Sequence, residues 1–451
     1  MQSQLPPELL DYIFTFMRDD HPSLRHCAAV NHMFSELVER HLFYQITLSN
    51  SENYIGRGEP SPAQISKLLT DKTHLESHVK SLRIVMASFG ILRWFTLRSM
   101  ADEDMGQTLL ILSHLTDVSL SGLHSGITSW QRFHHIFQTS FARILRLPSM
   151  DSVFIHDIED FPLSLLNNCT SLKSLSLRLV GYPTIPSPAI ASSETELPML
   201  EYLEILECTY ALSLILVWLL SPGSPKLTNL RVLRIMIQRI EDIVIIQAFL
   251  AAGSAQSLKY LYLDACDIAR TTYNTIGEVV YPPDSTPHQV LDLSGLPHLE
   301  SLTIEANIKS TTTFWISSNG EEEIDAYNLQ TPIPWIGQLL QSLSYHSSER
   351  PKGLQRIILE LSFLIDKHSL TRLDWEPFST VLKSSQLSSL RTVQIRVVRC
   401  ESTSLNLGAL DSALRGDQYL SELVESGLLL IDTTSCQENL GPVHPWSSFK
   451  L

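Results

Sequence analysis

A short phrase recurs along this chain, and one copy of it reads Leu258-Lys259-Tyr260-Leu261-Tyr262-Leu263. An apolar residue is followed by two variable residues, a second apolar residue, one variable residue and a third apolar residue. The alternation at the end of the phrase is typical of a half-buried strand, because successive side chains of a strand point to opposite faces. Each copy is therefore predicted to form a strand.

Ten copies of the phrase follow one another between residues 79 and 395. Their apolar residues are Val79-Leu82-Ile84, Leu115-Val118-Leu120, Met150-Val153-Ile155, Leu172-Leu175-Leu177, Leu200-Leu203-Ile205, Leu230-Leu233-Ile235, Leu258-Leu261-Leu263, Leu299-Leu302-Ile304, Leu354-Ile357-Leu359 and Leu390-Val393-Ile395. One copy is common in any Leu-rich protein, but ten in order indicate stacked repeats of one structural unit.

Stretches with helical periodicity lie between the phrases. The clearest span residues 129–141, 210–220, 240–252, 335–345 and 375–382. Strand, helix and strand in this order predict parallel pairing. A helical run at 409–425, a strand at 428–431 and a frayed tail at 433–451 are expected to end the chain. Residues 183–198, 281–288 and 317–334, rich in Pro, Ser, Thr and acids, are predicted to be exposed loops.

Three copies carry a further position that suits a turn after the strand. The third residue beyond the last apolar one is Cys208, Cys266 or Asn307. A buried side chain at this place can bond the backbone of the turn. With it, the phrases resemble leucine-rich repeats, although most spacings exceed the usual repeat length of about 20–29 residues. The resemblance implies an α/β horseshoe with a concave parallel sheet and helices on the convex side.

The first 48 residues have a different, helical pattern. Three short helices are predicted, at 5–14, 24–30 and 34–48, with Pro6 and Pro7 in the first turn and Ser23 as the second N-cap. The first helix carries two apolar stripes, Leu5, Leu9, Ile13 and Leu10, Phe14, Met17. So small a unit cannot bury both stripes internally, so one is expected to await a partner.

This pattern resembles an F-box in its fungal form. The residues that carry the resemblance are Leu5, Pro6, Leu9, Ile13, Leu24, Cys27, Val30, Phe34, Leu37 and the run from Phe43 to Leu48. The family implies docking on a Skp-type adaptor, which leads to cullin and RING subunits of a ubiquitin ligase. The implied adaptor-binding residues are Leu5, Pro6, Leu9, Ile13, Leu24, Val30, Phe34 and Leu37. Many F-boxes carry a Trp late in the third helix, where this chain has Phe43 or Tyr44.

Composition narrows the remaining classes. The chain has 451 residues, 44% of them hydrophobic, and a net charge of −15. That charge argues against partners such as nucleic acid or an anionic membrane surface. The hydrophobic runs at 211–220 and 243–252 are about half as long as a helix that spans a bilayer. Six dispersed Cys and the lack of a charged leader before an apolar core predict an intracellular protein, cytoplasmic or nuclear, with reduced thiols.

Catalytic signatures are absent from the sequence. It contains no GxSxG, Walker A, GxGxxG or HExxH motif. His134 and His135 are adjacent and would point apart on a helix. Neither the histidines at 21, 26 and 32 nor the acidic run at 321–325 has metal-ligand spacing. We therefore expect no enzyme activity, no cofactor and no metal, and we expect Cys208 and Cys266 to be structural.

The recognition surface of such repeats is expected on the exposed strand positions. The central positions are Arg83, Ser119, Phe154, Ser176, Glu204, Arg234, Tyr262, Thr303, Ile358 and Gln394. Glu204, Arg234, Tyr262 and Asp264 are predicted to form a polar and aromatic target-binding patch on neighbouring strands.

These expectations combine into one organisation and two open functions. We predict an F-box at 1–48, a linker at 49–76, a leucine-rich-repeat-like solenoid at 77–431 and a tail at 432–451. The favoured function is a non-catalytic substrate receptor of a Skp, cullin and RING ligase, with an unknown protein as target. The alternative is a leucine-rich-repeat interaction scaffold whose degenerate F-box has no ligase role.

Overall fold

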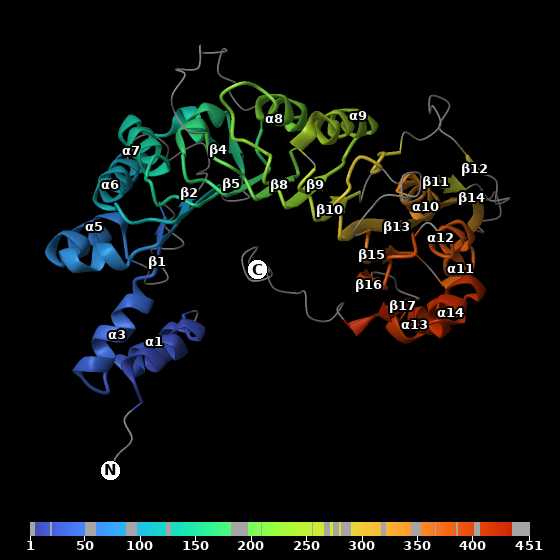
Figure 1. The fold of residues 1–451 in the computed structure, drawn as a ribbon, viewed down its shortest axis with the longest axis horizontal. Helices are drawn as coiled ribbons and strands as arrows, with labels where there is room; N and C mark the ends of the chain where they lie inside the picture. Colours follow the sequence, from blue (N-terminus) through green and yellow to red (C-terminus); the bar gives the residue numbers. More distant parts are fainter. Residues whose placement is uncertain are drawn as a thin grey trace. The chain divides into compact units, whose positions relative to one another are not determined.

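The structure is a computed structural model with two compact units, residues 1–227 and 228–451. It describes residues 5–18, 20–49, 60–86, 97–122, 128–181, 197–208, 210–254, 256–265, 271–273, 279–280, 290–316, 322–343, 353–365, 367–384, 387–400 and 406–434. Each unit contains parallel strands with helices in the connections, and Figure 1 traces their order. The predicted α/β class with a large parallel sheet is therefore confirmed.

Three helices open the first unit: α1 (Pro7–Phe16), α2 (His21–Ala28) and α3 (His32–Leu42). We call them the helical trio. Pro7 lies in the first turn of α1, as predicted, whereas Pro6 is the N-cap residue just before it. The prediction of Ser23 as the second N-cap is wrong, because Asp20 takes that role and its carboxylate accepts the Ser23 amide at 3.1 Å. Helix α2 can then begin at His21, with Pro22 in the first turn, where a missing N–H costs nothing.

The sheet of the first unit begins earlier than predicted. Helix α3 ends at Leu42, and residues expected at its end form strand β1 (Gln45–Ser49), which pairs in parallel with β2 (Ser81–Met86). The alternation of buried Ile46 and Leu48 with less buried neighbours explains the strand. The predicted linker also contains helix α5 (Pro62–Asp71), which Ser61 and Gln64 start with a capping box.

The remaining strands of this unit continue the parallel order. They are β3 (Asp117–Gly122), β5 (Ser152–His156), β7 (Ser174–Arg178) and β8 (Tyr202–Leu206). A separate parallel pair is formed by β4 (Thr128–Ser129) and β6 (Ile158–Glu159). The connections contain η1 (Thr73–His78), α6 (Leu97–Ile111), η2 (Trp130–Arg132), α7 (His135–Leu145), η3 (Leu163–Asn168) and α8 (Leu212–Leu219).

A repeated backbone feature ends three of these strands. Asp157, Leu179 and Glu207 directly follow β5, β7 and β8 and all have positive φ, between 50° and 58°. The Asp157 amide donates to the Arg178 carbonyl at 2.9 Å, and the Leu179 amide donates to the Leu206 carbonyl at 3.0 Å. Such left-handed residues are uncommon outside Gly. Here each bond ties the end of one strand to the end of the next.

The second unit contains further parallel strands. Its strands, in order of pairing, are β9 (Val232–Met236), β10 (Tyr260–Asp264), β13 (Ser301–Ile316), β15 (Arg356–Leu364), β16 (Thr392–Cys400) and β17 (Leu429–Asp432). The connections contain α9 (Ile240–Phe249), η4 (Leu250–Ser254), α10 (Ile333–Ser342), α11 (Lys367–Leu370), α12 (Glu376–Leu382), α13 (Leu407–Gly416) and α14 (Gln418–Glu425). In all ten phrases of the sequence, the second and third apolar residues thus lie on a strand.

One predicted loop is wrong in its described part. Residues 317–334 were expected to be exposed, but β14 (Glu322–Thr331) pairs antiparallel with the long β13 and with β11 (Thr271–Tyr273), which also pairs with β12 (Val279–Val280). Leu329 and Thr331 are each 1% exposed, and α10 begins at Ile333. The polar composition of these residues predicted a loop because β14 lacks the apolar phrase that marks the other strands. It forms a strand because it pairs with β13. The other two predicted loops lie mostly outside the described residues.

Candidate docking surfaces

The helical trio buries only one of the two apolar stripes of α1. Leu10 and Phe14 are 7% and 2% exposed, and they pack with Leu24 and Val38 in the core of the trio. Leu5, Leu9 and Ile13 are 54%, 49% and 43% exposed. The prediction that one stripe is left open is therefore confirmed.

Two aromatic residues extend this open stripe. Tyr12 and Phe16 are 62% and 65% exposed, and their rings meet edge to face with centroids 4.9 Å apart. We call Leu5, Leu9, Tyr12, Ile13 and Phe16 the α1 apolar surface. Neither aromatic belongs to the stripes predicted from sequence, although Leu9, Tyr12, Ile13 and Phe16 follow the helical i, i+3, i+4, i+7 spacing.

The other expected adaptor-binding residues have mixed positions. Pro6 and Val30 are exposed, the latter by 65%. Phe34 and Leu37 are half-buried and pack against the core of the trio. Leu24 is fully buried. A direct contact of Leu24 with a partner is therefore incompatible with this fold, and its role is to hold α2 against α1 and α3.

The exposure predicted for the central strand positions is partly wrong. The register does align these positions within each unit, for example Arg83 with Ser119 and Arg234 with Tyr262. However, Phe154, Ser176, Glu204 and Ile358 are only 7%, 3%, 2% and 8% exposed. The alternating pattern identifies which face a side chain takes, but burial on that face depends on the size of its neighbours.

The predicted target-binding patch is not exposed throughout, because Glu204 is 2% exposed. Glu204 belongs to the first unit, where the hydroxyls of Ser176 and Tyr202 donate to its two carboxylate oxygens at 2.6 and 3.0 Å. Arg234, Tyr262 and Asp264 belong to the second unit. The Arg234 guanidinium lies 4.2 Å from the centre of the Tyr262 ring, which is close enough for a cation–π contact.

The Tyr262 hydroxyl is held by carboxylates from two further strands. It donates to Glu305 on β13, and one carboxylate oxygen of Glu360 on β15 lies 3.2 Å from the same hydroxyl. The other Glu360 oxygen accepts from Arg396 at 3.2 Å. Burial and the nearby Glu305 carboxylate raise the pKa of Tyr262. Burial and the nearby Asp264 carboxylate also raise the pKa of Glu305. These side chains satisfy one another, so the cluster links β10, β13, β15 and β16.

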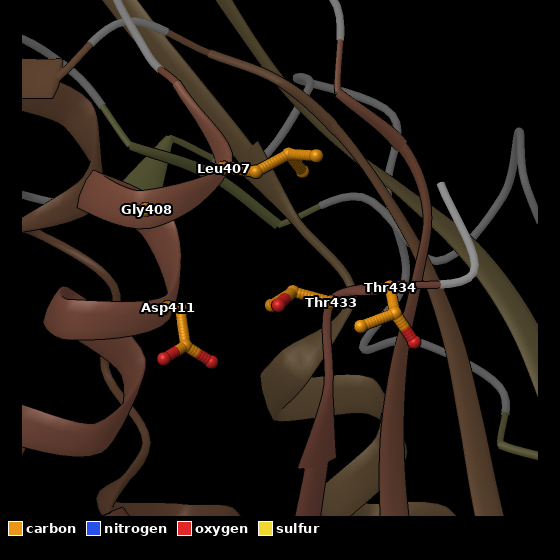
Figure 2. A pocket seen from close by; sticks show the side chains of 5 residues that line it. All are labelled: Leu407, Gly408, Asp411, Thr433 and Thr434. Atoms are coloured by element: carbon orange, nitrogen blue, oxygen red, sulfur yellow. The ribbon is translucent and has the colours of Figure 1, made fainter. Parts of the chain in front are cut away.

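One shallow hollow lies at the end of the described chain. Leu407, Gly408 and Asp411 of α13 line it together with Thr433 and Thr434 (Figure 2). The Asp411 carboxylate is bound by Arg415 Nε at 2.9 and 3.0 Å, and Arg415 also donates to the Ile431 carbonyl at 2.9 Å. Asp411 and Arg415 thus connect α13 to β17 and stabilise the fold at this end of the described chain.

The expectation that His134 and His135 point apart on a helix is wrong, because only His135 lies within α7 and the two rings are close. His134 precedes α7 and His135 begins it, with ring centroids 4.4 Å apart. Among the described residues, no group of three His, Cys, Asp or Glu is arranged to hold a metal ion. Cys208 is 5% exposed, and its Sγ bonds the carbonyls of Leu177 and Leu206 at 3.6 and 3.2 Å. Cys266 and the acidic run at 321–325 lie outside the residues whose side chains are described.

Burial raises the pKa of the Cys208 thiol to about 12 and that of Cys169 to about 12. Neutral, buried thiols are poor nucleophiles.

Over the described part of the chain, no helix combines the length and apolar character required to cross a membrane. No protein-family model matches this sequence, and no curated protein is significantly similar to it.

Proposed function

We propose that the chain is the substrate receptor of a Skp, cullin and RING ubiquitin ligase, with the helical trio as its F-box. The observation that carries the proposal is the α1 apolar surface on an N-terminal unit of three short helices. Isolated exposed apolar side chains are ordinary, whereas four on one face of α1, with Leu5 just before the helix, mark an interaction site. The F-box resemblance of the same residues supplies the partner, a Skp-type adaptor.

The rest of the chain supports a receptor. The ten phrases form parallel strands in two units, and the leucine-rich repeats that they resemble present a sheet face to protein ligands. The receptor would contribute no reacting group. It would bring a bound target close to a ubiquitin-loaded partner and raise the effective concentration of the target's lysines.

The test is a calorimetric titration of the full chain with a Skp-type adaptor. Leu9→Ser together with Ile13→Ser removes two exposed apolar side chains, each worth about 1.5–3 kcal/mol if a partner buries it fully. We expect a loss of affinity of at least about a hundredfold. The melting temperature should hold, because both side chains are exposed in the free protein.

The matched control is Val217→Ser on α8, an exposed apolar residue outside the trio. It should bind the adaptor like wild type. If the adaptor does not bind the wild-type chain, the result would instead favour the alternative function, an interaction scaffold without a ligase role. Equal binding by wild type and the double variant would remove the α1 apolar surface from the proposal.

A further inference from the structure

The helical trio is joined to the sheet of the first unit at Tyr44. Only Phe43 and Tyr44 separate α3 from β1. The Tyr44 carbonyl accepts both the Lys80 and the Ser81 amides at 2.9 Å, which binds it to the start of β2. The backbone of Tyr44 therefore belongs to the sheet, while its side chain faces the trio.

The side chain of Tyr44 meets Arg18, which lies just beyond the end of α1. The Arg18 guanidinium is 4.0 Å from the centre of the Tyr44 ring. Its Nε also donates to His41 Nδ1 on α3 at 3.2 Å, and His41 Nε2 lies 2.9 Å from Asp11 Oδ1 on α1. We call Asp11, His41, Arg18 and Tyr44 the clasp.

The chemistry of Arg18 determines the state of His41 in the clasp. A guanidinium can only donate, so His41 Nδ1 must present its lone pair, and its proton must lie on Nε2, facing Asp11. His41 is 4% exposed, so both ring nitrogens need these partners. The clasp thus runs without a break from a carboxylate on α1, through α3, to a ring held by the sheet.

A second link joins α3 of the trio to η1, which precedes β2. The ion pair of His74 and Glu39 spans 3.4 Å, with the two side chains 58% and 27% exposed. Exposed ion pairs of this kind stabilise an orientation only weakly.

Besides Arg18, the charged group Asp117 on β3 also acts on Tyr44. Burial and this carboxylate raise the pKa of Tyr44, so its phenol stays neutral at physiological pH and suits a cation–π partner.

We propose that the clasp holds the helical trio in a single orientation on the β1 edge of the first unit. Arg18 and Tyr44 are its positioning residues, and they act beside the two-residue connection and the contact of α3 with η1. This inference does not depend on what the α1 apolar surface binds. In the proposed receptor, the clasp would fix the orientation of the bound adaptor relative to the sheet of the first unit.

The experiment measures distances between paired spin labels in the full chain by double electron–electron resonance. Labels on genetically encoded keto residues leave the native cysteines untouched. One pair, at His32 and Lys67, spans the trio and α5, and a second pair, at Glu8 and His32, stays inside the trio. All three positions are exposed.

The decisive variant is Arg18→Met, which keeps a long apolar side chain but loses the guanidinium. We expect the distance between 32 and 67 to change from one narrow peak to a broad distribution, while the distance between 8 and 32 stays narrow. Tyr44→Phe keeps the ring, and His41→Gln keeps one acceptor and one donor. Both should retain the narrow peak of wild type.

Two results would overturn the proposal. A narrow distance between 32 and 67 in Arg18→Met would show that the clasp does not set the orientation. Broadening of both distances would make Arg18 a stabiliser of the trio itself. Adaptor binding is not measured here, so failure of the proposed ligase role would leave either distance result intact.

Discussion

The Ser176 hydroxyl on β7 donates a hydrogen bond of 2.6 Å to the Glu204 carboxylate directly across on β8. Tyr202, two residues before Glu204, donates to the second carboxylate oxygen at 3.0 Å. Glu204 is 2% exposed. A carboxylate at a central strand position therefore serves the sheet and is not available to a ligand.

We predict that Glu204→Leu lowers the free energy of unfolding by about 1–3 kcal/mol, because at least two hydroxyl donors lose their acceptor. Glu204→Gln should cost less, since the amide keeps one acceptor oxygen for Ser176. Urea unfolding of both variants checks the order. A Leu variant as stable as wild type would mean that the carboxylate is not needed to hold these strands.

The strands could be predicted from sequence because their signal is local. Leu175 and Leu177 bury the same face in any sheet, so alternation alone places them. The exposure of Glu204 could not be predicted, since it depends on Ser176 and Tyr202 reaching the same carboxylate. The open stripe of α1 was predictable from periodicity and the size of the unit. The clasp was not, because Arg18 and Tyr44 are 26 positions apart and meet only once α3 has turned the chain back.

A close approach at Gly122 leads to a second prediction. A Cβ on Gly122 would lie 2.4 Å from the carbonyl oxygen of Asp157, whose positive φ is set by the turn after β5. Gly122→Ala should therefore destabilise the protein by about 1–3 kcal/mol, as overpacking does. Gly295→Ala is the control, since nothing lies within 4 Å of its Cβ. Thermal unfolding should separate the two, and equal melting temperatures would contradict the predicted clash.

The buried thiols make stability depend on pH in the alkaline range. Burial raises the pKa of Cys208 from its ordinary value of 9.0 to about 12. Above pH 9 the unfolded chain loses this proton while the folded chain keeps it. The contribution of Cys208 is thus fully present below pH 9 and is lost as the pH rises towards 12.

We predict that Cys208→Ala loses less unfolding free energy than wild type between pH 8 and pH 10. Denaturant titrations at both values measure the difference, and subtracting the variant removes the contributions of other groups. Native Cys208 should also react with a thiol reagent only after unfolding. A reaction as fast as that of a free thiol would contradict its burial.

The last prediction concerns the target of the proposed receptor. Tyr262 and its carboxylate partners bond one another, so we expect a target to bind other, accessible side chains of the same sheet. Tyr260 is 38% exposed and Arg356 is exposed, and both align with Ser301 on the strand between them. They are therefore about 10 Å apart. Tyr and Arg are the residues that most often dominate a protein interface.

Changing Tyr260 and Arg356 together to Ala should weaken target capture by at least about tenfold. Stability should change little, because neither side chain is buried. Quantitative mass spectrometry of proteins captured by wild type, by the double variant and by Val244→Ser on α9 checks this, since Val244 is exposed outside the sheet. Adaptor affinity should stay the same in all three. Proteins depleted only from the double variant would be the targets, and identical captured sets would exclude this part of the sheet as the recognition surface.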